Sequence, residues 1–296
     1  MIRFGLCCIF DQQHIKFKTT TVTAISKMNS DDAQAKISGL CNQNADSLMQ
    51  AIDFCVKNKI GCFRITSRIL PIKTHSVYGY NLVDLPDGEL ILNKFKSCGD
   101  YAKKNNIRLC FHPDQFVVLN SQKPDVIENS LKEIEYQAEV AEWVGADVVN
   151  IHGGGVFGDK TTALIDLAKN INRLSDRARS RLTLENDDVS YTVSDLLPIC
   201  TSEKIPLVYD VHHHRCNKDN LSIEQATDKA ISTWNREPLF HISSPINGWD
   251  GKKQEQHHDF IDFNDFPTYW NNFDLTVEVE AKAKETAILK LMEYFQ

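Results

Sequence analysis

The sequence predicts an α/β fold, a single-domain (β/α)8 TIM barrel that takes up residues 1–296. Three observations lead to this fold class. Short runs dense in Val, Ile, Leu and Phe alternate with amphipathic segments of helical period along the whole chain. Eight such runs are present, which is the number of strands in a closed barrel of this type. The chain is long enough for one large core, and no linker rich in Pro, Gly or Ser divides it.

The expected strands are short and continuously apolar, as parallel strands are when both of their faces are covered. Each run is also rich in β-branched and aromatic residues, which favour strands. The runs span residues 2–9, 62–66, 107–112, 147–152, 181–186, 206–211, 239–243 and 275–280.

Helices are expected between the strands, and several carry start and stop signals. Ser30 is expected to cap the helix at 31–59, and Gly61 follows the end of that helix. Pro124 opens the next clear helix, at the position where proline is tolerated. The remaining helical segments lie near residues 89–105, 160–179, 192–202, 222–234 and 283–295, with a short one near 264–272.

A doubly wound open sheet is the alternative to a barrel. It is not supported, because no GxGxxG pattern follows the first strand. The glycine cluster HGGGVFGDK at 152–160 lacks the GKS or GKT ending of a phosphate loop. It also resembles an esterase oxyanion loop, but no GxSxG nucleophile elbow accompanies it. A tight turn after a strand is therefore the expected role of these glycines.

Composition and charge narrow the class of protein. The formal net charge of −7 argues against nucleic-acid binding by bulk charge alone, although a local basic rim or bound cations would still allow it. Arg64, Arg68 and Lys73 follow the second strand and could hold phosphates at such a rim.

The cysteines and the apolar runs indicate a cytoplasmic protein. The nine cysteines lie mostly in apolar runs without CxxC spacing, which predicts reduced, buried thiols. No apolar run reaches the roughly 18 residues that a transmembrane helix needs, so no membrane association is expected. The N-terminal MIRFGLCCIF is interpreted as a first strand and not as a signal peptide.

Side chains that can bind metals stand at successive strand ends. In a barrel these ends converge on one rim, where catalytic groups lie. Buried carboxylates are costly unless cations balance them, and mixed His and carboxylate ligands suit Zn²⁺ or Mn²⁺. The sequence therefore predicts a multinuclear metal site from the strand-end residues His112, His152, Glu185, Asp210, His241 and Glu280, with His257 and His258 in the loop at 244–263.

The tract YDVHHHRC at 209–216 belongs to this site. Asp210 and His213 are expected to bind metal. His212 is expected to point to the other side of the strand, and His214 to support the ligands without binding metal itself.

Seven stretches, in order along almost the whole chain, resemble the UV damage endonucleases. They are FRITSRILP (63–71), FHPDQFVVLN (111–120), NIHGGG (150–155), LTLENDD (182–188), VYDVHHH (208–214), HISSP (241–245) and VEAK (279–282). The resemblance implies a TIM-barrel DNA-repair enzyme that cuts double-stranded DNA directly 5′ to cyclobutane pyrimidine dimers and 6-4 photoproducts. It implies 3′-hydroxyl and 5′-phosphate products, and no ATP or other nucleotide cofactor. The implied cofactor is a cluster of three divalent ions, manganese first, with zinc, magnesium and cobalt as alternatives.

The resemblance also assigns roles to the metal-binding side chains. Glu185 is implied to bridge two ions. One of them would also be bound by His112 and His152, and the third ion of the cluster by His213 and His258. The second ion bridged by Glu185 would be completed by Asp210, His241 and Glu280.

Three further positions match the family outside this ligand set. His75, after the second strand, matches a site histidine. Gln115 and Phe116 match the pair that probes the damaged duplex, and a polar and an aromatic side chain beside a metal ligand can fill the gap left by extruded bases. The alternative is that Phe116 begins the apolar run FVVL and belongs to the core.

The chain departs from some family members at three positions. Leu6 and Phe116 stand where some members have tyrosine, so the probe is less polar here. Leu239 stands where some members carry a modified lysine, so no lysine-derived ligand is available at that position.

Three other functions stay open at this point. An abasic-site endonuclease of the endonuclease IV type would share the barrel, three metals and the D-x-x-H spacing of Asp210 and His213. That family uses an Asp-x-His pair after the seventh strand, whereas Gln256 stands two residues before His258. A sugar isomerase with two divalent cations would leave HPDQF unexplained. A non-enzymatic module that stores metal or binds DNA would leave the density of ligands unexplained.

Overall fold

The computed structural model describes residues 1–295. Within them, eight parallel strands close into a barrel in sequence order, with β1 beside β8. This confirms the fold class predicted from the sequence. The strands are β1 (Ile2–Cys7), β2 (Cys62–Ile65), β3 (Arg108–Phe111), β4 (Val148–His152), β5 (Leu182–Glu185), β6 (Leu207–Asp210), β7 (Leu239–Ile242) and β8 (Leu275–Val279).

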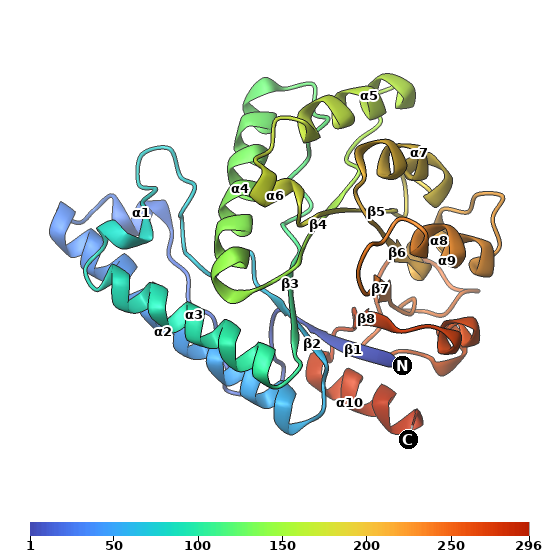
Figure 1. Cartoon of the computed structure of the whole chain (residues 1–296), viewed down its shortest axis with the longest axis horizontal. Coiled ribbons are helices and arrows are strands. Elements are labelled where there is room, and N and C mark those ends of the chain that lie inside the picture. Colours follow the sequence, from blue (N-terminus) through green and yellow to red (C-terminus); the bar gives the residue numbers. More distant parts are fainter. Residues whose placement is uncertain (296) are drawn as a thin grey trace.

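Helices follow the strands and lie around the outside of the barrel (Figure 1). Because they cover the outer face and side chains fill the inside, the strands are buried on both faces, which explains their continuous apolar runs. The longer helices are α2 (Ser30–Lys57), α3 (Gly88–Lys104), α4 (Pro124–Val144), α5 (Lys160–Ile171), α7 (Val193–Glu203), α9 (Ile223–Ile231) and α10 (Lys284–Tyr294).

Several details of the helix prediction are wrong. Asn29, not Ser30, caps α2, because its side chain accepts a hydrogen bond from the backbone of Asp32. The segment predicted as one helix at 160–179 is interrupted, since Ser175 caps a separate short helix, α6 (Asp176–Arg179). The short helix expected near 264–272 consists of the 3-10 turns η2 (Phe263–Asp265) and η3 (Thr268–Asn272).

Three short elements were not predicted. They are α1 (Val22–Ile25), α8 (Val211–Cys216) and the 3-10 turn η1 (Leu82–Asp84). Of these, α8 matters most for function, because it turns the HHH tract into a helical turn directly after β6.

Strand register brings the predicted ligands to one rim. His152 at the end of β4 pairs with Glu185 at the end of β5, and Asp210 at the end of β6 pairs with His241 on β7. Because all strands are parallel, their carboxyl ends open toward the same side of the barrel. The barrel therefore places the side chains of His152 and Glu185, and those of Asp210 and His241, at paired positions on adjacent strands.

The glycine cluster after β4 lies close to the side chain of Asn120. Gly154 has a φ of +88°, and a Cβ atom there would lie 2.1 Å from Oδ1 of Asn120. The amide of Asn120 donates a hydrogen bond to the carbonyl oxygen of Gly155 at 2.8 Å. The cluster thus fixes the loop that follows the ligand His152.

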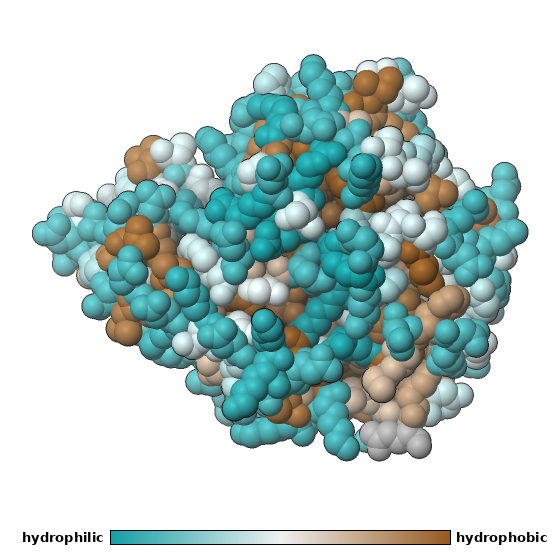
Figure 2. Space-filling view, viewed as in Figure 1, coloured by the Kyte–Doolittle hydropathy of each residue, from teal (hydrophilic) through white to brown (hydrophobic). Residues whose placement is uncertain are grey.

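Most of the buried side chains are apolar, and the outer surface is mainly hydrophilic (Figure 2). Hydrophobic residues appear as separate patches on the face shown in Figure 2. Leu239 packs inside the barrel against Cys62, Cys110, Val148 and Val208, so the position of the modified lysine of some relatives is part of an apolar layer here. The nine cysteines in the described residues are free thiols. No helix within residues 1–295 is long and apolar enough to span a membrane.

Candidate metal centre

Glu185 lies at the middle of a histidine cluster on the carboxyl rim, and it is 1% exposed. Nε2 of His112 lies 2.9 Å from Oε2 of Glu185, and Nδ1 of His241 lies 3.1 Å from Oε1. Nδ1 of His213 is 3.3 Å from the same Oε1, and Nε2 of His152 is 3.9 Å from Oε2. Both oxygens of one carboxylate therefore face histidines from different elements of the barrel.

Three overlapping groups of side chains on this rim have ligand atoms within 4.8 Å of one another. They are His112–His152–Glu185, His112–His241–Glu280 and Glu185–Asp210–His213. Glu185 and His112 each belong to two groups, and a shared carboxylate is what adjacent metal ions require. The structure thus brings together the predicted metal ligands apart from His258. His213 groups with Glu185 and Asp210, whereas the sequence paired it with His258.

Backbone carbonyl groups orient two of the histidine rings. Nδ1 of His112 lies 3.0 Å from the carbonyl oxygen of Pro113, and Nδ1 of His213 lies 3.0 Å from that of Asn186. A carbonyl oxygen only accepts hydrogen bonds, so it keeps the proton on Nδ1 of a neutral ring. Nε2 of each ring is then free to bind a cation.

The carboxylates and histidines of the cluster shift one another's pKa values. Burial favours a raised pKa for Glu185, but His241 and His152 hold that pKa well below its usual range. Burial opposes the charge of His241, yet the Glu185 carboxylate raises the pKa of His241 to about 10. Burial also opposes the charge of His213, whose pKa Asp210 and Glu185 hold well above its usual value. The carboxylates that raise the pKa of His241 and His213 would also attract metal cations.

Two unpaired buried atoms show that the residues fit a metal. Oδ2 of Asp210 and Nδ1 of His152 are buried and have no hydrogen-bond partner among the described residues. The other carboxylate oxygen of Asp210 accepts a hydrogen bond from the backbone of His213 at 2.8 Å. An unpaired buried carboxylate oxygen is costly, and a coordinated cation would satisfy it. Imidazole nitrogens and carboxylate oxygens are also ligands that Mn²⁺ and Zn²⁺ accept.

In the loop after β7, the side chain of His257 lies near the cluster, and the side chain of His258 does not. Nδ1 of His257 lies 3.8 Å from Oε2 of Glu280, and its ring packs against His212. His258 is exposed, and its Nδ1 accepts a hydrogen bond from the backbone of Phe260 at 3.0 Å. The assignment of His258 to the cluster is therefore corrected, because the loop turns this side chain toward its own backbone.

The three histidines of the HHH tract point in different directions from α8. Only His213 of the three joins the metal groups in the described structure. His212 is fully buried on α8 and packs against Trp249, with ring centroids 5.2 Å apart, and neither of its ring nitrogens has a hydrogen-bond partner among the described residues. Nδ1 of His214 lies 2.6 Å from the hydroxyl of Tyr209, and Nε2 lies 3.3 Å from Asp219. His214 thus stabilises the base of α8.

The sequence analysis missed two inward-facing side chains. Asn150 on β4 donates a hydrogen bond to Oε2 of Glu185 at 2.5 Å. Glu278 on β8 lies with Oε2 2.9 Å from Nε2 of His241. The strand period carried the signal for both, because a residue two positions before a strand-end ligand points to the same side as that ligand. Glu278 stands in this relation to Glu280, and Asn150 to His152.

Arg64 is placed inside the barrel and not on a DNA-binding rim. Its Nε donates a hydrogen bond to Glu278 at 2.7 Å, and Nη2 lies 2.7 Å from Oε1 of Glu280. The expectation that Arg64 holds phosphates is therefore wrong, since two carboxylates already engage the buried guanidinium group.

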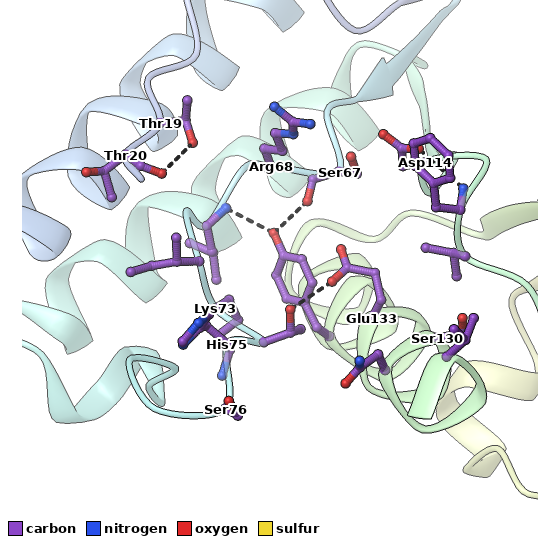
Figure 3. Close-up of a pocket in the computed structure, with 18 residues that line it drawn as sticks. Thr19, Thr20, Ser67, Arg68, Lys73, His75, Ser76, Asp114, Ser130 and Glu133 are labelled. Atoms are coloured by element: carbon purple, nitrogen blue, oxygen red, sulfur yellow. Dashed lines mark hydrogen bonds between the residues drawn. The ribbon is translucent and has the colours of Figure 1, made fainter. Parts of the chain in front are cut away.

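A cavity of about 750 Å³ lies between the loops after β2 and β3 and one face of α4 (Figure 3). Arg68, Lys73, His75 and Phe116 line it, so the cavity gathers predicted recognition residues from two loops. His75 belongs to this cavity and not to the metal groups. Its Nδ1 accepts hydrogen bonds from the backbone of the residues two and three positions later, each at 3.2 Å.

One wall of this cavity is polar. Tyr136 donates a hydrogen bond to the carbonyl oxygen of Ser67, and Thr74 donates to Glu133 at 3.0 Å (Figure 3). Burial raises the pKa of Glu133. The wall therefore offers polar groups to a guest as well as apolar contact.

The two basic residues at the cavity, Lys73 and Arg68, differ in whether their side chains are free to contact a phosphate. Lys73 donates a hydrogen bond to the carbonyl oxygen of Tyr80 at 2.6 Å and lies 3.5 Å from Glu139. The chain itself thus engages Lys73, which corrects its expected role as a phosphate contact. Arg68 is exposed, and its guanidinium has no ion-pair partner within residues 1–295.

Phe116 is 75% exposed at the edge of the cavity, and its neighbour Gln115 is also exposed. The alternative that Phe116 belongs to the core is therefore wrong. At the edge of the cavity, the exposed ring is available to contact a bound partner.

Comparison with known proteins gives the family. Residues 2–296 match the family described as UV-endonuclease UvdE. The chain belongs to this family. A UV DNA damage endonuclease of Bacillus cereus (strain Q1) is 30% identical over 286 residues, which cover 93% of this chain and 88% of the relative. The UvdE family protein described here is therefore a DNA-repair endonuclease, a hydrolase whose substrate is DNA.

Solved structures agree with the family. The crystal structure of SacUVDE matches with a TM-score of 0.88 and 27% identity, and covers 100% of this chain and 98% of that chain. Endonuclease IV from Thermus thermophilus matches with a TM-score of 0.63 and 14% identity, over 99% of this chain and 97% of that chain. The second match shows a shared fold.

Family membership decides between the functions that the sequence left open. The argument from Gln256 against an abasic-site enzyme loses its force, because His257 faces the cluster and an acid, Glu255, precedes it by two residues. The UvdE match carries the distinction instead. It also argues against a sugar isomerase and a non-enzymatic module.

Proposed function

We propose that this UvdE family protein cuts double-stranded DNA immediately 5′ to cyclobutane pyrimidine dimers and 6-4 photoproducts, leaving 3′-hydroxyl and 5′-phosphate ends. The observation that carries the proposal is the sharing of Glu185 between two ligand groups, close to an exposed aromatic residue and a cavity. Residues 1–296 would act as one barrel domain in the cytoplasm, which suits the free thiols. No nucleotide cofactor and no membrane take part.

The proposed cofactor is a cluster of three divalent ions, with Mn²⁺ preferred and Zn²⁺, Mg²⁺ or Co²⁺ as substitutes. His112, His152, Glu185, Asp210, His213, His241 and Glu280 would hold the ions, with His257 in the place first given to His258. Such ions activate water, orient a phosphate and neutralise charge on a leaving oxygen. The protein keeps the ligands in place through the buried hydrogen bonds of His112, His213 and Glu185.

Recognition is proposed to use the loop after β3. Phe116 and Gln115 would occupy the stack that the damaged bases leave, and Arg68 would hold a nearby phosphate. A photodimer pairs poorly, so extruding it costs less than extruding normal bases, by on the order of a few kcal/mol. The cavity of about 750 Å³ is within the range of about 300–1,000 Å³ that small-molecule sites show, and it could take extruded bases.

The test uses two duplexes of the same sequence with Mn²⁺. One duplex carries a single thymine dimer, and the other carries an abasic site at the same position. Incision of the first, with a 3′-hydroxyl directly 5′ to the dimer, is the expected result. Incision of the abasic duplex alone would overturn the proposal in favour of the endonuclease IV type of activity.

A further inference from the structure

A buried polar layer lies directly beneath the metal centre, inside the barrel. Glu278 is its middle member and is 1% exposed. Oε2 of Glu278 lies 2.9 Å from Nε2 of His241 and accepts a hydrogen bond from Nε of Arg64 at 2.7 Å. Its other oxygen, Oε1, accepts a hydrogen bond from the thiol of Cys110 at 2.8 Å. These contacts fix both carboxylate oxygens of Glu278. Glu278 itself is not a member of the three metal groups on the rim.

A hydrogen-bond donor, Arg64, and an acceptor, Glu278, face the same nitrogen of His241. Nη2 of Arg64 lies 3.1 Å from Nε2 of His241, almost as close as Oε2 of Glu278. A guanidinium group only donates, so it favours a ring with a lone pair on Nε2. A carboxylate only accepts, so it favours a proton on Nε2.

The position of the proton on the His241 ring decides whether His241 can bind a metal. Nδ1 of His241 faces the cluster, 3.1 Å from Glu185 and 3.5 Å from Glu280. Coordination through Nδ1 requires a lone pair there, and the ring must then carry its proton on Nε2. The Arg64 contact favours the opposite tautomer, in which Nδ1 carries the proton and cannot coordinate.

We propose that Glu278 is a positioning residue that keeps the proton of His241 on Nε2 and thereby directs the Nδ1 lone pair to the metal centre. Arg64 holds Glu278 and Glu280 at the correct separation, because it contacts both carboxylates. Cys110 prevents the Glu278 carboxylate from turning, through the hydrogen bond to Oε1. The proposal rests on the proposed function, since it deepens the account of the same metal site.

A different role for this layer is a metal site of its own. Sγ of Cys62 lies 3.8 Å from Sγ of Cys110, and both thiols lie near Glu278. The buried cation of Arg64 argues against it, because the guanidinium already neutralises the carboxylate and would repel a further cation. Burial also raises the pKa of the Cys110 thiol well above its usual value, which disfavours the thiolate that binds metal.

The test compares Glu278→Gln with Glu237→Gln. Glu237 forms a similar ion pair with Arg3 at the opposite end of the barrel, at 2.8 Å, so the control removes the same kind of contact far from the metals. The side-chain amide introduced by Glu278→Gln has a neutral acceptor and also an NH2 donor in place of the charged carboxylate, so it no longer enforces a proton on Nε2 of His241 and leaves the charge of Arg64 less balanced. We expect Glu278→Gln to weaken Mn²⁺ binding by about 10- to 100-fold in a competition with a chelator, and the control to leave it unchanged.

A spectroscopic measurement separates tautomer control from loss of packing. In protein labelled with ¹⁵N-histidine and loaded with Zn²⁺, the His241 Nδ1 signal should have the shift of a metal-bound nitrogen in the parent and in the control. In Glu278→Gln it should move toward the shift of a protonated nitrogen.

The outcomes are decisive in each direction. Unchanged Mn²⁺ affinity and an unchanged His241 signal in Glu278→Gln would overturn the inference. If Co²⁺-loaded parent shows thiolate-to-metal absorption that Cys110→Ser removes, the layer is a metal site and the inference also fails. If Glu278→Gln does not fold, Glu278→Asp keeps the charge but withdraws the oxygen, and the same loss of affinity is expected. Failure of the proposed function is distinguishable, because the parent protein would then not incise the dimer duplex, whereas its Mn²⁺ affinity and His241 signal would still respond to Glu278→Gln.

Discussion

Replacing Phe116 with Ala should impair incision of damaged DNA and leave the fold intact. The side chain is 75% exposed, so its truncation removes little buried surface and should change the free energy of unfolding by less than about 0.5 kcal/mol. If the ring stacks on bases, its loss costs about 1–3 kcal/mol of binding. Since about 1.4 kcal/mol is a factor of ten, the dissociation constant for dimer-containing DNA should rise about 5- to 150-fold.

The assay measures binding and incision of a duplex with one thymine dimer, together with the melting temperature of each variant. Ile165→Ala is the matched control, because Ile165 is 63% exposed on α5, on the outside of the barrel. The control should match the parent in binding, incision and melting. A Phe116→Ala protein that melts several degrees lower and still incises at the parent rate would refute the reasoning. An equal loss on undamaged DNA would show that Phe116 does not read the lesion.

Four further outcomes are expected. Glu185→Gln should keep the fold but lose bound metal and reduce incision by more than about 100-fold, measured with metal content checked on the same sample. Treatment with a chelator should stop incision, and added Mn²⁺ should restore it. Arg68→Ala should weaken damaged and undamaged DNA alike and reduce the slope of log affinity against log salt by about 1, whereas weakening confined to damaged DNA would make Arg68 a lesion-reading residue. Glu237→Gln should lower the melting temperature at neutral pH. Burial alone would raise the pKa of the Glu237 carboxyl, but the ion pair with Arg3 lowers it. The stabilisation by this ion pair is therefore complete above the usual carboxyl pKa and is lost as pH falls through the lowered pKa. The melting temperatures of parent and variant should converge in acid.

The sequence by itself determined the barrel and most of the side chains that gather in possible metal-binding groups on its rim. Short, continuously apolar runs rich in β-branched residues are typical of strands covered on both faces, and eight of them alternating with amphipathic helices leave few arrangements. In a parallel barrel every strand end reaches the same rim, so residues that close strands, such as His112, Glu185 and Asp210, must meet. Their convergence followed from chain order and strand period alone.

Only the tertiary structure decided the contacts of loop residues and the partners of buried charges, because strand period and chain order do not determine them. His257 and His258 are adjacent in an irregular loop without a repeating pattern, so only the path of that loop shows which ring faces Glu280. Arg64 was expected on the rim because it stands near a strand end, but the barrel turns it inward onto Glu278. Whether a side chain of β2 meets one of β8 depends on the register and closure of the barrel, which are properties of all eight strands together. The partners of a buried charge are therefore set by the closed barrel, and local sequence supplies only the candidates.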